Sequence, residues 1–179
     1  MKPNDLTRIA LFAAVTAVLS QISIPLPFSP VPITFSIVAV MLAGGLLSPS
    51  QALLSQIVYL LIGAVGAPVY AGLRGGIPVL FGPTGGYLMA YPLMALGIAI
   101  VVKHARHKLS ALLISMLGAL LICYSLGTPW LAYSAGLSLK AALMAGVVPF
   151  VALDVIKAIS CAIITHTVSR RLAKLQTVA

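Results

Sequence analysis

The chain has 179 residues, of which 61% are hydrophobic and only 7% are charged. Because a soluble domain carries about 25% charged residues, this composition excludes a water-soluble globule, and it also excludes intrinsic disorder, which requires low hydrophobicity. Two cysteines are too few for a secreted disulfide scaffold. The net charge of +9 does not indicate nucleic-acid binding, because the basic residues lie at the ends of apolar runs. The expected protein is a membrane-embedded single domain over residues 1–179.

The apolar runs predict six membrane-spanning helices, since one span needs about 20 mainly apolar residues. They are expected at residues 6–22, 34–47, 51–65, 84–102, 109–126 and 139–168. Pro149 interrupts the last run, which is therefore either one kinked helix or a short piece followed by a main span from about Phe150. The expected fold class is an all-α integral membrane protein, a six-transmembrane-helix bundle.

Three connections between the expected spans have distinctive compositions. Residues 25–32 contain four prolines and are expected to form a stiff loop, because proline lacks a backbone donor and fixes φ. Residues 66–83 are the longest expected irregular segment, a glycine-rich extracellular loop between the third and fourth helices. Residues 127–136 are expected to be a loop whose Trp130 and Tyr133 suit a membrane interface.

The distribution of basic residues predicts the orientation in the membrane. With six spans, eight basic residues lie on the side of the two termini and two lie on the other side. The first group is Lys2, Arg8, Lys103, Arg106, Lys108, Arg170, Arg171 and Lys174, and the second is Arg74 and Lys140. Because basic residues accumulate on the cytoplasmic side, both termini are expected in the cytoplasm.

Asp154 is the acidic residue that points to a function. It lies in an apolar run with Lys157 three positions later, and residues so spaced share one face of a helix. An ionisable pair inside a span is costly and is typically functional, so we expect it in a site for a small solute. The alternative is an ion pair that only packs the bundle. The other carboxylate, Asp5, is expected to be a solvated cap residue.

The sequence predicts neither a catalytic site nor a metal site. The glycine-rich segment lacks the Gly-Lys-Ser/Thr of a P-loop, and the strand and acidic residue of a dinucleotide site are absent. His104 and His107 have no carboxylate or cysteine near them in the sequence. Arg74 is expected either to pair with an anion or to contact lipid headgroups.

Small residues recur at four-residue spacing in the first span, where they predict a docking surface. Ala10 pairs with Ala14, and Ala13 pairs with Ala17. Such spacing lets two helices approach closely in a membrane, which suits association with another membrane protein.

Several motifs together resemble the BioY family, the biotin-specific substrate-binding (S) components of energy-coupling factor (ECF) transporters. They are residues 30–34 (Pro-Val-Pro-Ile-Thr), residues 63–72, residues 82–87 (Gly-Pro-Thr-Gly-Gly-Tyr), and Pro149-Phe150 with Asp154 and Lys157. The resemblance covers essentially the whole chain. The chain departs from the family at Ser36, where glutamine is frequent, and at Leu153, where glycine is frequent.

The resemblance implies a six-helix S component in a prokaryotic cell membrane that binds biotin with high affinity near the outer face and needs no cofactor. It also implies a membrane-embedded coupling (T) subunit and two cytoplasmic ATPase subunits as partners, with Ala10, Ala13, Ala14 and Ala17 as the docking surface. The expected ligand-binding residues are Thr34, Ser36, Tyr70, Arg74, Thr84, Gly85, Gly86, Tyr87, Asp154 and Lys157. Tyr70, Phe81 and Tyr87 are expected to form an apolar wall.

Biotin suits such a site chemically, because its ureido group offers two N–H donors and one strong acceptor. A carboxylate can accept from the donors, and an ammonium group can donate to the carbonyl. An S component for a different vitamin, a membrane enzyme and a scaffold subunit without a ligand are the alternative functions.

Overall fold

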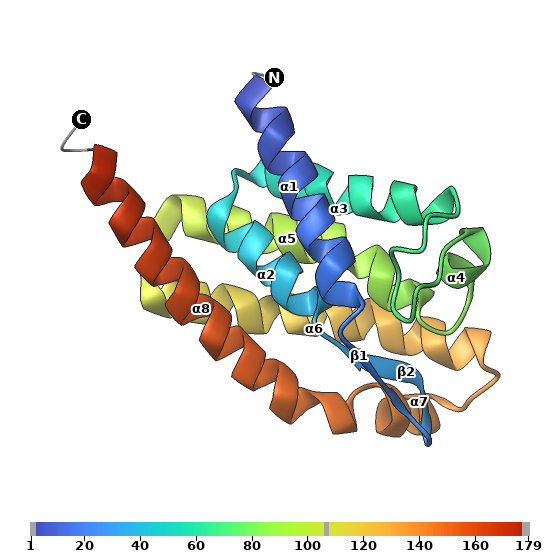
Figure 1. Cartoon of the computed structure of the whole chain (residues 1–179). Helices are drawn as coiled ribbons and strands as arrows, with labels where there is room; N and C mark the ends of the chain where they lie inside the picture. The colour runs from blue at the N-terminus through green and yellow to red at the C-terminus, as the bar shows by residue number, and fades with distance from the viewer. Residues whose placement is uncertain (1–2, 106–107, 177–179) are drawn as a thin grey trace.

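The computed structural model describes residues 3–105 and 108–176, most of which are helical. The long helices pack side by side into one bundle, with both ends of the chain on the same side (Figure 1). They are α1 (Pro3–Ser20), α2 (Ser36–Leu46), α3 (Pro49–Ala64), α5 (Gly85–Ala105), α6 (Leu109–Ser134) and α8 (Val148–Gln176). The connections contain two short helices, α4 (Ile77–Phe81) and α7 (Leu139–Gly146), and two strands, β1 (Ser23–Leu26) and β2 (Ser29–Thr34).

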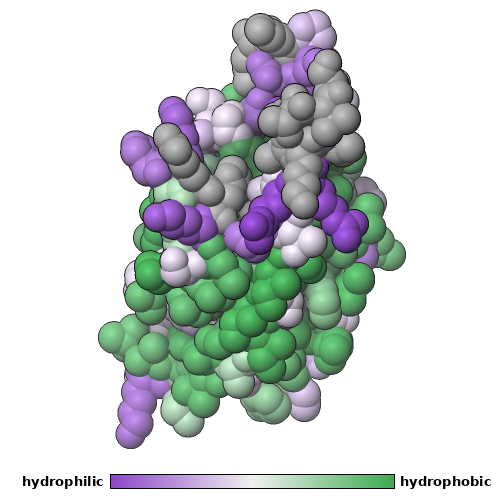
Figure 2. All heavy atoms as spheres, turned by 90° about the vertical axis from the view of Figure 1, so that its left-hand side faces the viewer, coloured by the Kyte–Doolittle hydropathy of each residue, from purple (hydrophilic) through white to green (hydrophobic). Residues whose placement is uncertain are grey.

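The surface of the bundle is that of a membrane protein. Within the described residues, α5, α6 and the part of α8 up to Arg171 are long and apolar enough to cross a membrane, while α2 and α3 are shorter apolar helices. Large apolar side chains such as Val18, Ile114 and Leu121 are exposed. Figure 2 shows a broad hydrophobic face, with hydrophilic residues gathered toward the end where the termini lie.

Helix α5 forms the centre of the bundle, because it packs against α2, α3 and α6. Its inward side chains, among them Met94, Ala95 and Ile98, are completely buried. Helices α1 and α8 lie at the periphery, α1 against α2 and α3, and α8 against α2 and α6. This arrangement leaves the end of the bundle opposite the termini to be closed by the hairpin, α4 and α7 (Figure 1).

The proline-rich connection is an antiparallel β-hairpin rather than the expected irregular loop, so the fold is not entirely helical. Ser23 pairs with Thr34, and Leu26 pairs with Ser29, with an irregular register between Ile24 and Leu26. Both strands are edge strands, and an edge strand tolerates proline because the N–H on its outer side needs no partner.

The sequence-based helix boundaries near residues 127–136 were also wrong. Helix α6 continues to Ser134 with Pro129 inside it. A membrane helix tolerates an internal proline when neighbouring groups satisfy the freed backbone. The indole Nε1 of Trp130 donates to the carbonyl of Gly82 at 3.0 Å, which ties this turn to the chain before α5.

The last apolar run follows the second of the two expected arrangements. Helices α7 and α8 are separate, with Val147 between them, and Pro149 lies in the first turn of α8, where proline is well tolerated. The glycine-rich segment is interrupted by α4, so it is less irregular than expected. Asp5 lies within the first turn of α1 rather than at its cap, and its Oδ1 accepts a hydrogen bond of 2.7 Å from Gln51.

Candidate functional site

A cavity of about 510 Å³, here called the large cavity, lies at the end of the bundle that the hairpin closes. Its walls come from the C-terminal end of α1, both strands of the hairpin, α3, the α3–α4 connection and the first turns of α5. Small-molecule sites are typically concave spaces of about 300–1,000 Å³ that combine apolar walls with a few polar groups. The large cavity has the size and the position of such a site.

Four tyrosines, Tyr59, Tyr70, Tyr87 and Tyr91, line the large cavity. The ring of Tyr59 meets Tyr70 edge-on, with centroids 5.6 Å apart, and stacks on Tyr91 at 6.4 Å. The hydroxyl of Tyr70 donates to the carbonyl of Leu60 at 2.6 Å. Burial raises the pKa of Tyr70 to about 12, so its phenol is protonated at neutral pH. These rings provide flat apolar surface against which a ring or an alkyl chain can pack.

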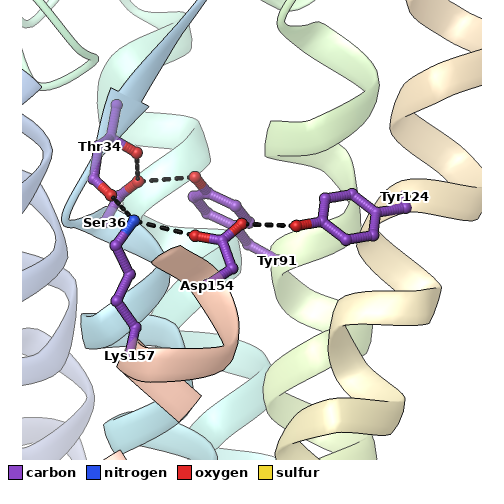
Figure 3. Close-up of polar contacts among 6 residues, drawn as sticks. All are labelled: Thr34, Ser36, Tyr91, Tyr124, Asp154 and Lys157. Carbon is purple, nitrogen blue, oxygen red and sulfur yellow. Dashed lines mark hydrogen bonds and ion pairs between the residues drawn. The ribbon is translucent and has the colours of Figure 1, made fainter. Parts of the chain in front are cut away.

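Asp154 and Lys157 form an ion pair on the face of α8 that points into the bundle (Figure 3). The Lys157 Nζ lies 2.9 Å from Asp154 Oδ1 and donates a second bond of 2.9 Å to the carbonyl of Thr34. The other carboxylate oxygen, Oδ2, accepts a 2.7 Å bond from the hydroxyl of Tyr124 on α6. The side chains are only 7% and 11% exposed, so the pair is held in a poorly solvated environment.

A chain of hydroxyl groups extends this network from β2 to α5 (Figure 3). The hydroxyls of Thr34 and Ser36 are 2.7 Å apart, and those of Ser36 and Tyr91 are also 2.7 Å apart. All three residues line the large cavity. The buried ion pair is therefore connected, through Thr34, to the polar wall of the large cavity.

The ion pair itself borders a second, small cavity of about 50 Å³. This space has room for only a few water molecules. The two cavities share five lining residues, namely Val31, Pro32, Thr34, Tyr87 and Tyr91. Asp154 and Lys157 thus lie beside the large cavity and behind its hairpin wall, rather than in its lining.

Most of the other residues predicted to bind the ligand do border the large cavity: Thr34, Ser36, Tyr70, Arg74, Thr84 and Tyr87. Gly85 and Gly86 do not border it. They pack against other parts of the protein instead, since a side chain on Gly85 would collide with the Leu80 carbonyl, and one on Gly86 would collide with Trp130. Phe81 is 64% exposed and packs on Trp130, with ring centroids 6.3 Å apart, so it is not part of the cavity wall.

Sequence reasoning missed several residues of this site. Among them, Ser20, Tyr59 and Tyr91 line the large cavity, and Tyr124 donates a hydrogen bond to the carboxylate of Asp154. A signal was present for Tyr59, since it follows Gln56 and Ser55 in an apolar helix, and polar residues within a span often face a cavity.

The turn between Tyr70 and Arg74 covers part of the large cavity and is fastened to the end of α1. The two residues exchange backbone hydrogen bonds of 2.9 and 3.2 Å. Leu73, between them, has a positive φ of 56°. Its N–H donates to Gln21 Oε1 at 3.0 Å, while Gln21 Nε2 donates to the carbonyl of Tyr70 at 3.3 Å. The Gln21 side chain therefore holds the turn at both Tyr70 and Leu73.

The four alanines of the expected docking surface do not share one environment. Ala10 and Ala14 are exposed on α1, and Ala17 is half-buried. Ala13 is only 2% exposed and packs inside the bundle, so it cannot contact a partner. The outer face of α1 presents Ala10 and Ala14 between the exposed side chains of Leu6 and Val18.

The described residues contain no group of three or more His, Cys, Asp or Glu side chains that could hold a metal ion. The Nδ1 of His104 forms a hydrogen bond of 2.8 Å with the carbonyl of Ile100 in its own helix. His107 lies outside the described residues.

Comparison with known sequences points to one family. The model of the BioY family matches residues 1–174. A probable biotin transporter BioY of Pyrococcus horikoshii is 39% identical over 166 residues, which cover 93% of this chain and 96% of that protein. The biotin transporter BioY of Thermotoga maritima is 36% identical over 173 residues, which cover 97% of this chain and 98% of that protein.

The fold agrees with these sequence matches. A crystal structure of the S-component for biotin from an ECF-type ABC transporter matches with a TM-score of 0.86 and 29% identity, over 95% of each chain. Because the family match extends over nearly the whole chain and the two relatives exceed one third identity, this chain belongs to the BioY family.

Proposed function

We propose that this chain binds biotin and acts in its uptake as the S component of an ECF transporter. The observation that carries the proposal is the large cavity with a polar wall connected to the buried Asp154–Lys157 pair. Biotin as the ligand is supported by the relatives, which are named biotin transporters, and by the structural match to an S-component for biotin. A membrane enzyme would need a cluster of acids, bases or metal ligands, and Asp154 is the one buried carboxylate among the described residues.

The ligand lies with its body in the large cavity and its ureido ring toward Thr34, Ser36 and the ion pair. The ammonium group of Lys157 has three N–H donors, of which two are engaged by Thr34 and Asp154. One donor is thus left for the ureido carbonyl. Each oxygen of Asp154 accepts one bond, from Lys157 or from Tyr124, and keeps a lone pair for a ureido N–H.

The apolar part of biotin packs against the tyrosine rings of Tyr70 and Tyr87, and its carboxylate lies near Arg74. Arg74 is exposed where it borders the large cavity, so its guanidinium can meet an anion without being desolvated. Thr84, which also borders the cavity, supplies a further hydroxyl, while Gly85 and Gly86 act by allowing close packing of the chain around it.

Equilibrium binding to the detergent-solubilised protein, with biotin and a panel of other vitamins, tests this function. Tight binding of biotin alone is the expected result. Preference for another vitamin would reassign the ligand, binding of none would favour a scaffold subunit, and chemical turnover of a lipid would favour an enzyme.

The membrane arrangement belongs to the same proposal. The chain forms one domain over residues 1–179 whose six spans are α1, α2, α3, α5, α6 and α8. The basic residues Arg8, Lys103, Lys108, Arg170 and Arg171, none of them buried, support cytoplasmic termini. Lys2, Arg106 and the side chain of Lys174 lie outside the described residues.

This orientation predicts the side from which single cysteines can be labelled. In a background with Cys123 and Cys161 replaced by alanine, a membrane-impermeant thiol reagent added outside intact cells should label position 74 and not position 108. Neither position is buried. Labelling of position 108 alone would contradict the proposed orientation.

The proposed partners are a membrane-embedded coupling subunit and two cytoplasmic ATPase subunits. This chain has no nucleotide-binding motif, so energy for transport has to come from other subunits. The exposed Ala10 and Ala14, with the half-buried Ala17, form a surface that another helix can approach closely.

Substitution Ala14→Trp is expected to weaken binding of the coupling subunit and to spare biotin binding, because the indole ring blocks close helix approach. Pull-down of the partner and biotin binding are measured on the same preparation. Ile114→Trp is the matched control, since Ile114 is 70% exposed on α6, a helix that packs against α5, α7 and α8. Equal pull-down for the two variants would refute docking at α1.

A further inference from the structure

The hydroxyl of Tyr124 joins α6 to α8 at the buried ion pair. It donates a hydrogen bond of 2.7 Å to Oδ2 of Asp154, while Lys157 holds Oδ1 at 2.9 Å. Tyr124 is half-buried and borders the small cavity together with Asp154 and Lys157. A hydrogen bond to a carboxylate is shorter and stronger than one between neutral groups, so this contact holds the Asp154 side chain in addition to the ion pair.

The two donors reach the carboxylate from different parts of the fold. Lys157 lies on α8 itself, whereas Tyr124 lies on α6, and Figure 3 shows them on opposite sides of Asp154. The carboxylate of an aspartate turns easily about its last torsion, because that torsion has broad minima. Turning it here would break at least one of the two bonds. The orientation of the carboxylate is therefore fixed by α6 and α8 together.

An oriented carboxylate binds a ligand better than a mobile one. Hydrogen bonds weaken steeply when donor and acceptor are misaligned, and a group that is already ordered loses less entropy when the ligand binds. Because Asp154 already accepts from Lys157 and from Tyr124, its remaining lone pairs suit a further donor and disfavour an acceptor. The ureido N–H groups of biotin are such donors.

We propose that Tyr124 is a positioning residue for biotin binding, whose hydroxyl orients the Asp154 carboxylate to accept a ureido N–H. The inference rests on the proposed biotin function, and it requires no contact between Tyr124 and the ligand. The competing role for Tyr124 is a bond between α6 and α8 that only stabilises the bundle. That role would lower the thermal midpoint and leave the affinity of the folded protein unchanged.

The test is Tyr124→Phe, which keeps the ring and removes only the hydroxyl. We expect biotin affinity to fall about three- to tenfold, the range that corresponds to one hydrogen bond of ordinary strength. Equilibrium binding is measured on protein that elutes as the folded species. Tyr133→Phe is the matched control, since Tyr133 lies on the same helix, is 85% exposed and borders neither cavity. Its affinity should stay within about twofold of the parent.

A second ligand separates the positioning of Asp154 from a general distortion of the cavity. Thienylpentanoic acid carries the pentanoic acid chain of biotin on a sulfur-containing ring and has no ureido group. Its affinity, measured by competition with labelled biotin, should change by less than about twofold in Tyr124→Phe. An equal loss for both ligands would show that the substitution alters the shape of the cavity, and it would overturn the proposal.

A double-mutant cycle tests whether Tyr124 acts through the ion pair. In the background of Asp154→Asn with Lys157→Met, adding Tyr124→Phe should change biotin affinity by less than about twofold, because no carboxylate remains to be oriented. The same loss in both backgrounds would show that Tyr124 acts independently of Asp154. That result, or parental affinity in Tyr124→Phe, overturns the proposal and leaves the biotin function intact. A parental protein that binds no biotin would refute both.

Discussion

Removing both charges of the Asp154–Lys157 pair is expected to weaken biotin binding more than removing either one. Asp154→Asn keeps the shape but loses the charge, and Lys157→Met keeps the stem but loses the donors. A hydrogen bond to a charged group contributes roughly 1.5–3 kcal/mol, and a factor of ten in affinity corresponds to about 1.4 kcal/mol. Each single substitution should therefore weaken binding at least tenfold, as measured by equilibrium binding of biotin.

The double variant separates a binding role from a packing role. Each single variant leaves one buried charge without its partner, which costs about 3–5 kcal/mol of stability, so a loss of binding in the singles could reflect misfolding. Asp154→Asn with Lys157→Met leaves no unpaired charge and should recover the elution volume and thermal midpoint of the folded protein. If that folded double variant binds biotin with parental affinity, the pair only packs the bundle.

Gly127→Ala is expected to abolish most biotin binding by displacing Tyr87. Gly127 on α6 lies against the ring of Tyr87, and an added Cβ would overlap three ring carbons. The same ring lines both cavities, and its hydroxyl donates to the carbonyl of Gly146 at 3.2 Å. Overpacking of this kind costs about 1–3 kcal/mol, and the shifted ring moves the wall between the two cavities.

Gly118→Ala on the same helix provides the comparison, because an added Cβ there has no heavy atom within 4 Å. Alanine is favoured over glycine in a helix by up to about 1 kcal/mol, so this variant should be as stable as the parent or more so. Thermal unfolding and biotin affinity are measured for both variants. Unchanged affinity in Gly127→Ala would show that the position of Tyr87 does not determine binding.

The helices and the ion pair could be predicted from the sequence because each follows from a local pattern. Apolar runs bounded by prolines, glycines and basic residues mark α1, α2, α3 and α5 to within a few residues, and Pro149 marks the start of α8. Asp154 and Lys157 share a helix face by their spacing alone, and the structure joins them at 2.9 Å. Their partner Tyr124 comes from another helix, 30 residues away in sequence, and no local pattern indicates that contact.

The hairpin could not be predicted because its four prolines hide the strand signal. Proline usually argues against a strand. Prolines also occupy alternate positions, at Pro25 and Pro27 and again at Pro30 and Pro32, so the alternation of apolar and polar residues that marks a strand is lost. Gly85 and Gly86 illustrate a different limit. A glycine shows that something approaches closely, but only the structure identifies Leu80 and Trp130, rather than a ligand, as the approaching groups.

The length of α2 has a consequence for the hairpin that precedes it. Its 11 residues rise about 16 Å at about 1.5 Å per residue, roughly half of the about 30 Å hydrocarbon thickness of a bilayer. In the proposed membrane arrangement the hairpin continues the span that α2 begins, with its backbone groups partly paired between its strands and with Ile24 and Phe28 exposed. No residue of α2 is exposed, so neighbouring helices rather than lipid surround it, and the exposed side chains of the hairpin wall are what meet the lipid on this side of the cavity.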